Sequence, residues 1–535
     1  MSYRVWLAVA LCVTPAHSAL KFWFGPKPTK GFTQVSPATV YGAGSEYGFD
    51  LGSKVTALDR GVTGENGRPF FFSARLAAGA YRVTVTLGDM KAASTTTVKS
   101  ETRRLMLEAV LTAAGKFATR TFLVHLRRPQ LPDGATVALK PRERDPILYV
   151  QWDEATRIPF LELDWDEKLT LEFSGEHPSL RSIEIASAEK PVTVYLIGDS
   201  TVTDQMMEPW GAWGQMLPRW FAPPVLIANY AESGETTASF ISERRWPKLL
   251  SEIHAGDYVL MQFGINDRSL PLDRFQQYFV QFIQDTRAHG ATPVLVTSQN
   301  LRRLDENGKA VPTLGGYPDA MREVAKQQNA TLIDLNAMSA ALYEALGPEK
   351  LAKAFVDGTH QNSYGAYELA KCVVSGIVQA ELGFASHVAE DWKGFDPAHP
   401  DPIERFRLPP DPQLDPARPG ARQLTSFKFD FTAAIPAYSA QTGYGYEPGY
   451  PPGGKPFFFS VDVPEGNYRV TVKFGDTHAA SDNTVFAELR RLMIEQVRTD
   501  PGKFETRSFL VNVRRTAIAG GAQVRVTDRE KNMEA

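Results

Sequence analysis

Cysteine is almost absent from this sequence. The 535 residues contain only two, Cys12 and Cys372. Cys12 lies in an N-terminal segment that we expect to be removed, so no disulfide within the mature chain is predicted and stability must come from core packing. Cys372 stands among Leu369, Val373 and Val374, which indicates a buried, chemically inert thiol.

Long apolar runs and an excess of charge of one sign are also missing. After the N-terminal segment, no run approaches the roughly 20 apolar residues that a membrane-spanning helix needs. The 58 Lys and Arg residues nearly balance 61 Asp and Glu residues, which gives a formal net charge of −3. We therefore expect neither a membrane span nor a nucleic-acid partner. Metal-ligand spacings and Gly-rich phosphate loops are lacking too, so no metal and no cofactor is predicted.

The first 18 residues have the pattern of a secretory signal. Arg4 precedes an apolar run at 5–13, and small residues follow at Ala16 and Ser18. Charged, apolar and small positions in this order are what a signal peptidase reads. Residues 1–18 are therefore predicted to be a signal peptide and the protein to be secreted or periplasmic. The alternative is a buried first strand.

The sequence repeats itself at an offset of 387 residues, the distance from Phe70 to Phe457. The run RPFFFS at 68–73 returns as KPFFFS at 455–460, and the run RRLM that begins at Arg103 returns at Arg490. An internal repeat of this length indicates two copies of one structural domain.

Each copy has the alternation of antiparallel strands. Segment 81–87 alternates with period two and follows a Gly-containing turn. We predict two all-β sandwich (jelly-roll-like) domains, at 19–189 and at 423–535. The second is predicted to be incomplete, because its last residue aligns with Leu148. The closing segment of the first copy resembles galactose-binding-like modules, which implies that the sandwiches handle carbohydrate.

The middle of the chain reads as an α/β domain. Apolar runs typical of buried parallel strands alternate with helical stretches, and they lie at 192–197, 225–228, 258–263, 293–297 and 331–334. We place a central parallel sheet covered by helices at 190–388. Residues 389–422, dense in Pro and charge, are predicted to be a linker wrapped on the surface.

Four polar blocks follow these strands or close the domain. They are Gly198-Asp199-Ser200, Ala231-Glu232-Ser233-Gly234, Gly264-Ile265-Asn266-Asp267 and Asp357-Gly358-Thr359-His360. Ligands bind at the carboxyl ends of the strands in such sheets, so the blocks are expected to converge. In order and spacing they resemble the SGNH (GDSL-like) hydrolases, whose fold is flavodoxin-like.

The resemblance implies a role for each residue. Ser200 would be the nucleophile, His360 the general base and Asp357 the carboxylate that orients the imidazole. The oxyanion hole would come from the backbone N–H groups of Ser200 and Gly234 and from the side-chain amide of Asn266. The chemistry requires such a set, because a serine hydroxyl becomes nucleophilic only when a neighbouring base accepts its proton.

A narrower resemblance is to the rhamnogalacturonan acetylesterases. It is carried by residues 197–202, 213–217 and 229–234 and by Tyr364-Gly365-Ala366 after the last block. It implies removal of acetyl groups from an acetylated plant polysaccharide, with rhamnogalacturonan the first candidate and xylan or another acetylated glycan the alternative. Ile265, where this group often has a polar residue, departs from the pattern. A carbohydrate-binding protein without activity is the alternative of another class.

Four residues beside the blocks are candidates for substrate binding: Arg244, Arg245, Trp246 and Arg268. An anionic pectic backbone would favour cations near the site, and an indole could stack on a sugar ring. Solvated surface arginines are the alternative interpretation of the three cations. The sequence leaves the oligomeric state open.

Overall fold

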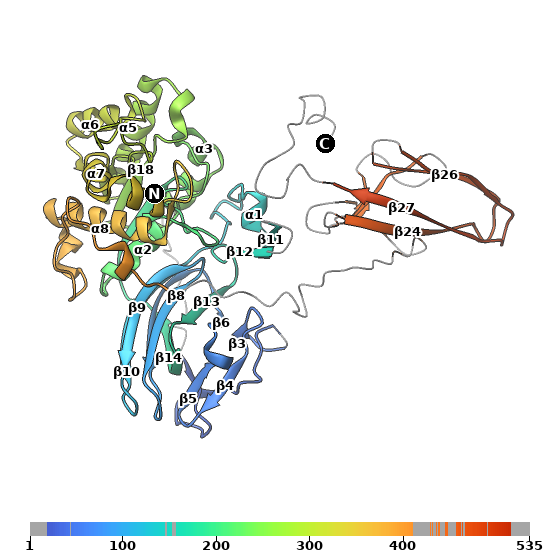
Figure 1. The fold of residues 1–535 in the computed structure, drawn as a ribbon, viewed down its shortest axis with the longest axis horizontal. Helices are drawn as coiled ribbons and strands as arrows, with labels where there is room; N and C mark the ends of the chain where they lie inside the picture. The colour runs from blue at the N-terminus through green and yellow to red at the C-terminus, as the bar shows by residue number, and fades with distance from the viewer. Residues whose placement is uncertain are drawn as a thin grey trace, which may run out of the picture. The chain divides into compact units, whose positions relative to one another are not determined.

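The structure is a computed structural model in which the chain packs into two compact units, residues 1–149 with 158–422 and residues 150–157 with 423–535. The described residues are 19–42, 44–144, 147–151, 157–409, 429, 431, 435, 437–438, 444–447, 456–461, 463, 466–488 and 491–514. The predicted signal peptide (1–18), the second half of the predicted linker (410–422) and the end of the second repeat (515–535) lie outside them. Figure 1 shows the ribbon with its strand and helix labels.

A five-stranded parallel sheet forms the centre of the α/β domain. Its strands are β15 (Val192–Gly198), β17 (Val225–Asn229), β18 (Tyr258–Gln262), β19 (Thr292–Val296) and β20 (Thr331–Ile333). All neighbouring pairs are parallel, and the order across the sheet is β17-β15-β18-β19-β20. This is the 2-1-3-4-5 order of flavodoxin-like sheets. All five strands lie where the apolar runs predicted them.

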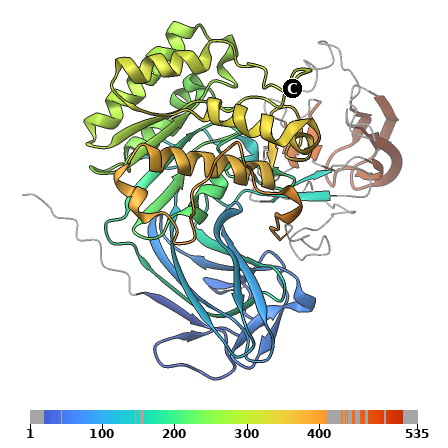
Figure 2. The same ribbon diagram turned by 60° about the vertical axis from the view of Figure 1, so that its left-hand side comes forward.

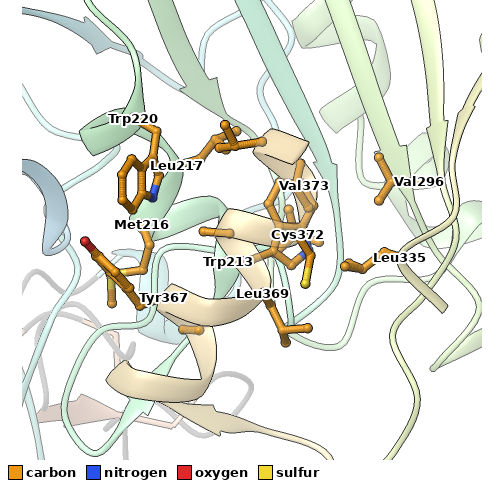
Figure 3. Close-up of a cluster of buried hydrophobic side chains, with 14 of the residues drawn as sticks. Trp213, Met216, Leu217, Trp220, Val296, Leu335, Tyr367, Leu369, Cys372 and Val373 are labelled. Carbon is orange, nitrogen blue, oxygen red and sulfur yellow. The ribbon is translucent and has the colours of Figure 1, made fainter. Parts of the chain in front are cut away.

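Helices cover both faces of this sheet because the strands are apolar on both sides. On β15, Val194 and Leu196 belong to one apolar cluster, and Tyr195 and Ile197 belong to the other. The first face is covered by α2 (Trp213–Met216), α7 (Leu335–Lys353) and α8 (Ser363–Gln379), and Figure 3 shows part of its core. The second is covered by α3 (Thr237–Ser242), α4 (Arg245–Leu250), α5 (Leu272–Ala288) and α6 (Tyr317–Gln327).

Cys372 lies in the first of these cores, as predicted. The thiol is buried, and burial raises its pKa far above the usual value of a cysteine. Trp213 packs in the same cluster and is fully buried. Residues 389–409 extend this core at the surface, where Trp392 and Phe406 pack against it.

The first repeat folds as two facing antiparallel sheets. One has seven strands, β1 (Leu20–Trp23), β2 (Thr33–Gln34), β4 (Val55–Leu58), β5 (Gly61–Gly64), β7 (Gly79–Leu87), β10 (Ala118–Leu126) and β14 (Ser179–Ser187). The other has five, β3 (Tyr47–Asp50), β6 (Phe70–Arg75), β8 (Ser94–Ser100), β9 (Arg104–Thr112) and β13 (Lys168–Ser174). The β1–β2 pairing is parallel. A core that includes Phe72, Val85 and Phe173 fills the space between the sheets.

The second repeat keeps the strand pairing of the first. Its strands include β24 (Gly466–Phe474), β25 (Ser481–Ala487), β26 (Arg491–Thr499) and β27 (Glu505–Val513), and β22 (Tyr444–Tyr446) pairs with β23 (Phe459–Val461). Leu126 pairs with Gly79 in the first copy, and Val513 pairs with Gly466 in the second. Both residue numbers are raised by the repeat offset of 387, so this strand pair has the same register in the two copies.

The first sandwich and the α/β domain are joined through buried charges. Figure 2 shows the two side by side within the larger unit. Arg104 of β9 forms an ion pair with Asp164, and its Nε lies 2.9 Å from Oδ2 of Asp204, in the loop after β15. All three side chains are at most 3% exposed. Arg127, also from the sandwich, donates to the carbonyl of Asn229 at the end of β17.

Among the described residues, no helix is long and apolar enough to cross a membrane. Two further short strands, β11 (Ile147–Gln151) and β12 (Arg157–Leu161), pair with each other. The helix α1 (Pro141–Arg144) precedes them and lies between the sandwich strands and this hairpin in the sequence.

The Arg104→Met variant tests the buried charges at the junction. Removing the guanidinium takes the contacting cation from the buried Asp204 and leaves Asp164 with Arg127 alone, so we expect a loss of about 3–5 kcal/mol in unfolding free energy. Urea unfolding followed by tryptophan fluorescence measures it. Arg120→Met, an exposed arginine on β10, is the control and should change stability by about 0.5 kcal/mol or less. Equal effects of the two variants would contradict the structural role of Arg104.

Candidate active site

The predicted site residues meet at the carboxyl edge of the central sheet. Ser200 lies two residues after the end of β15, the strand between β17 and β18. Gly234 lies in the loop after β17, and Asn266 lies in the loop after β18. His360 precedes the short strand β21 (Gln361–Asn362), which pairs with β16 (Trp210–Gly211) in the segment after Ser200. The fold therefore places all four blocks at one end of the sheet.

A serine, a histidine and an aspartate are hydrogen-bonded in series. Ser200 Oγ lies 2.9 Å from His360 Nε2, and His360 Nδ1 lies 2.8 Å from Asp357 Oδ2. A carboxylate only accepts hydrogen bonds, so Nδ1 carries the proton and Nε2 of the neutral ring is left to accept from the serine hydroxyl. The arrangement can thus remove the proton of Ser200 during an attack on a carbonyl carbon.

Asp357 is held as a carboxylate by its own loop. Its Oδ1 accepts hydrogen bonds of 2.7 Å from the backbone N–H groups of Thr359 and His360. Burial acts to raise the pKa of Asp357, but these hydrogen bonds and the one from the imidazole outweigh it and lower the pKa below its usual value. The spacing of three residues lets one tight turn carry both the carboxylate and the imidazole.

Three N–H donors belong to the loops at this end of the sheet. The backbone N–H groups of Ser200 and Gly234 find no acceptor within the described part of the chain. The Asn266 amide donates to the Glu235 carbonyl at 3.0 Å, which fixes its orientation and leaves its second proton available. Gly234 has φ +81°, a backbone conformation that favours glycine. Together these groups can stabilise an oxyanion.

The turn that presents Ser200 rests on a chain of buried polar side chains. Asp199 Oδ1 accepts from the backbone N–H and the hydroxyl of Thr201, at 2.9 and 2.8 Å. The Gln262 amide donates to the Thr201 hydroxyl, and the Trp213 indole donates to Gln262 Oε1. Burial raises the pKa of Asp199 to about 6. The supporting roles of Thr201 and Gln262 could not be predicted from the sequence, because neither residue stands out in its own segment.

Two of the four predicted substrate contacts need correction. The Arg245 side chain is 1% exposed and makes a two-pronged ion pair with Glu143 of the sandwich, at 2.8 and 2.6 Å. Trp246 is buried in the second core, and its indole donates to Asp285. Neither side chain can reach a polysaccharide. Both face inward because α4 packs between the sheet and a sandwich segment, which the sequence of α4 alone does not reveal.

Arg244 and Arg268 are exposed and stay candidates for substrate binding. Arg268 Nε donates to the Ile265 carbonyl at 2.8 Å, so its guanidinium is held two residues from Asn266. Ile265 itself is 3% exposed. The residue that departs from the family pattern is therefore a packed interior side chain.

The first sandwich contributes two residues to this region that the sequence did not predict. Lys140 and Arg142 lie against the loop that carries Gly234, where they form ion pairs with Glu235 and Glu232 respectively. Nothing in the sequence links these residues, because about ninety positions separate them. Within the described ranges, no group of three His, Cys, Asp or Glu side chains could hold a metal ion.

The fold and this site define an α/β serine hydrolase. The family model of the GDSL-like lipases and acylhydrolases matches residues 196–366. Rhamnogalacturonan acetylesterase RhgT of Bacillus subtilis is 41% identical over 221 residues, which cover 37% of this chain and 95% of the relative. This chain belongs to the GDSL-like lipase/acylhydrolase family and is a carboxylic ester hydrolase.

Two further relatives match the same share of the chain. The probable rhamnogalacturonan acetylesterase YesY of Bacillus subtilis is 32% identical over 218 residues, covering 37% of this chain and 98% of the relative. The rhamnogalacturonan acetylesterase of Emericella nidulans is 25% identical over 228 residues, covering 37% of this chain and 90% of the relative.

Asp357→Asn tests the role of the lowered pKa. Because the pKa of Asp357 lies below 3.8, the wild-type group is ionised throughout pH 6–9. An amide at this position favours the wrong imidazole tautomer, so we expect kcat on a small acetyl ester to fall by about 10³–10⁴-fold at every pH in this range. Asp396→Asn is a matched control, because Asp396 makes the same contact to His399, at 2.7 Å, in an exposed turn. Equal activities of the two variants would rule out the role.

Asp199→Asn tests the cost of a buried charge beside the nucleophile. The carboxyl titrates near 3.8 when unfolded and near 6 when folded, so the folded state holds the extra proton between these values and stability falls as pH rises through them. The shift corresponds to about 3 kcal/mol. We expect the unfolding free energy of the variant, relative to that of the wild type, to increase by about this amount between pH 4 and pH 7. Urea unfolding at each pH measures it. The exposed Glu306→Gln serves as control, and a difference that stays constant with pH would contradict the assignment.

Proposed function

We propose that this protein removes acetyl groups from rhamnogalacturonan through an acyl-enzyme on Ser200. The observation that carries the proposal is the 2.9 Å contact between Ser200 Oγ and His360 Nε2, beside unsatisfied N–H donors. The substrate is suggested by the relatives, of which RhgT is named a rhamnogalacturonan acetylesterase. The polysaccharide setting accords with the proposed secretion or periplasmic location.

In the first half-reaction, His360 Nε2 accepts the Oγ proton as Oγ attacks the acetyl carbonyl carbon. Asp357 keeps the resulting imidazolium oriented and stabilises its charge. The carbonyl oxygen becomes negative and accepts hydrogen bonds from the N–H groups of Ser200, Gly234 and Asn266. The carbon–oxygen bond to the sugar then breaks, and His360 returns the proton to the sugar oxygen.

In the second half-reaction, water replaces the sugar. His360 takes a proton from the water as the water oxygen attacks the acetyl-serine carbonyl, and the same three donors hold the second oxyanion. Collapse of this intermediate breaks the bond to Oγ and releases acetic acid, which ionises to acetate in solution, and the proton held by His360 restores the Ser200 hydroxyl. Each turnover thus consumes one ester and one water.

Acetate release from acetylated rhamnogalacturonan and from acetylated xylan tests the proposal. The Ser200→Ala variant loses the nucleophile, so we expect its release rate from the pectic substrate to fall by at least about 10³-fold. Ser269→Ala, an exposed serine after β18, is the control and should keep the wild-type rate. Faster release from xylan would shift the assignment to that glycan. Undiminished release by Ser200→Ala would overturn the mechanism.

A further inference from the structure

Two cations of the first sandwich converge on one backbone carbonyl beside the active site. Lys140 Nζ lies 2.6 Å from the Ser233 oxygen, and Arg142 Nη2 lies 2.6 Å from the same atom. A carbonyl oxygen has two lone pairs, and two charged donors occupy both. Charged donors make the stronger class of hydrogen bond. The side chains that hold this oxygen therefore come from the sandwich.

The same peptide group carries the Gly234 N–H. The Ser233 carbonyl and the Gly234 N–H belong to one planar trans peptide, so they point in opposite directions. Gly234 has φ +81° and no Cβ, and glycine adopts either sign of φ with little penalty. Sterics at this residue thus leave the peptide free to turn over. Fixing the carbonyl is what fixes the direction of the N–H.

Buried carboxylates hold the two cations in place. Lys140 is paired with Glu235, whose side chain is 0% exposed, and Arg142 is paired with Glu232, whose side chain is 6% exposed. A second contact from Arg142 Nε to Glu232 measures 2.9 Å. The carboxylates flank the Ser233–Gly234 peptide in the sequence, so each ion pair also fixes one end of the loop.

The third predicted donor depends on the same loop. The Asn266 amide donates to the carbonyl of Glu235, one residue beyond Gly234. Displacing the loop would therefore move two of the three donors at once. The two cations that donate to the Ser233 oxygen also polarise the peptide, which strengthens its N–H as a donor.

We propose that Lys140 and Arg142 are positioning residues for ester hydrolysis, which hold the Ser233 carbonyl so that the Gly234 N–H faces the oxyanion. The inference rests on the proposed acyl-serine mechanism and is independent of which polysaccharide is the substrate. It makes the first sandwich part of the catalytic centre. Neither cation touches the reacting atoms in this role.

Steady-state kinetics on p-nitrophenyl acetate test the inference. A misdirected donor weakens only the transition state, so in Lys140→Met and Arg142→Met we expect kcat to fall by about 10-fold each, with KM within about twofold of wild type. The double variant should lose about 10²-fold. Lys91→Met, an exposed sandwich lysine in a surface ion pair with Asp59, is the matched control and should keep both constants. Ser200→Ala in the same assay reports on the mechanism separately, since its full activity would refute the proposed function itself.

Each methionine variant takes one cation away from a buried carboxylate, so a neutral pair provides the second test. Arg142→Gln combined with Glu232→Gln removes both charges while keeping polar side chains, and it should lose kcat at unchanged KM. Arg142→Lys, which retains a cation at the carbonyl, should recover most of the rate. A kcat within twofold of wild type in the folded neutral pair, or a rise in KM alone, would overturn the inference. The latter result would assign these cations to substrate binding.

Discussion

The rest of the larger unit depends on the buried guanidinium of Arg104. It lies in the interior and contacts Asp164 and Asp204. Its charge comes from the sandwich, and Asp204 belongs to the loop that begins at the nucleophile. Burial acts to raise the pKa of Asp164, but Arg104 and Arg127 outweigh it and lower that pKa. Asp164 belongs to the sandwich like the two arginines, so the contact that crosses to the α/β domain is the one between Arg104 and Asp204. Relative movement of the two domains would remove this cation from a buried carboxyl group, which is costly in a medium of low polarity. The sandwich and the sheet therefore form one body.

This dependence extends to the surroundings of Ser200. Arg103, next to Arg104, donates to the carbonyls of Gln205 and Trp210, and the Gln205 amide donates to the Ser200 carbonyl at 2.6 Å. The loop after Gly198 is thus supported from the sandwich side as well as by the buried side chains of the sheet. Leu105 packs in the same apolar cluster as Trp213, so polar and apolar contacts reinforce one another at this junction.

Whether a feature can be predicted from the sequence depends on how far apart in the chain its interacting residues lie. The five strands of the sheet could be predicted because each is a local apolar run. The approach of Ser200, His360 and Asp357 could be predicted because strand order brings the ends of neighbouring strands together. The burial of Arg245 and Trp246 could not, because it depends on Glu143 and on core residues far away in the chain. The role of segment 140–143 was hidden for the same reason.

The pairing of β16 with β21 links the two sides of the site. Gly211, after the nucleophile, pairs with Gln361, the neighbour of His360. Asp357 and His360 share one turn, so their mutual geometry is set locally. The histidine and aspartate therefore shift as a unit when this turn moves, and only the distance to Ser200 varies. The reactivity of the serine is therefore controlled by one distance, that between His360 and Ser200. The short strand pair limits how far this distance can change.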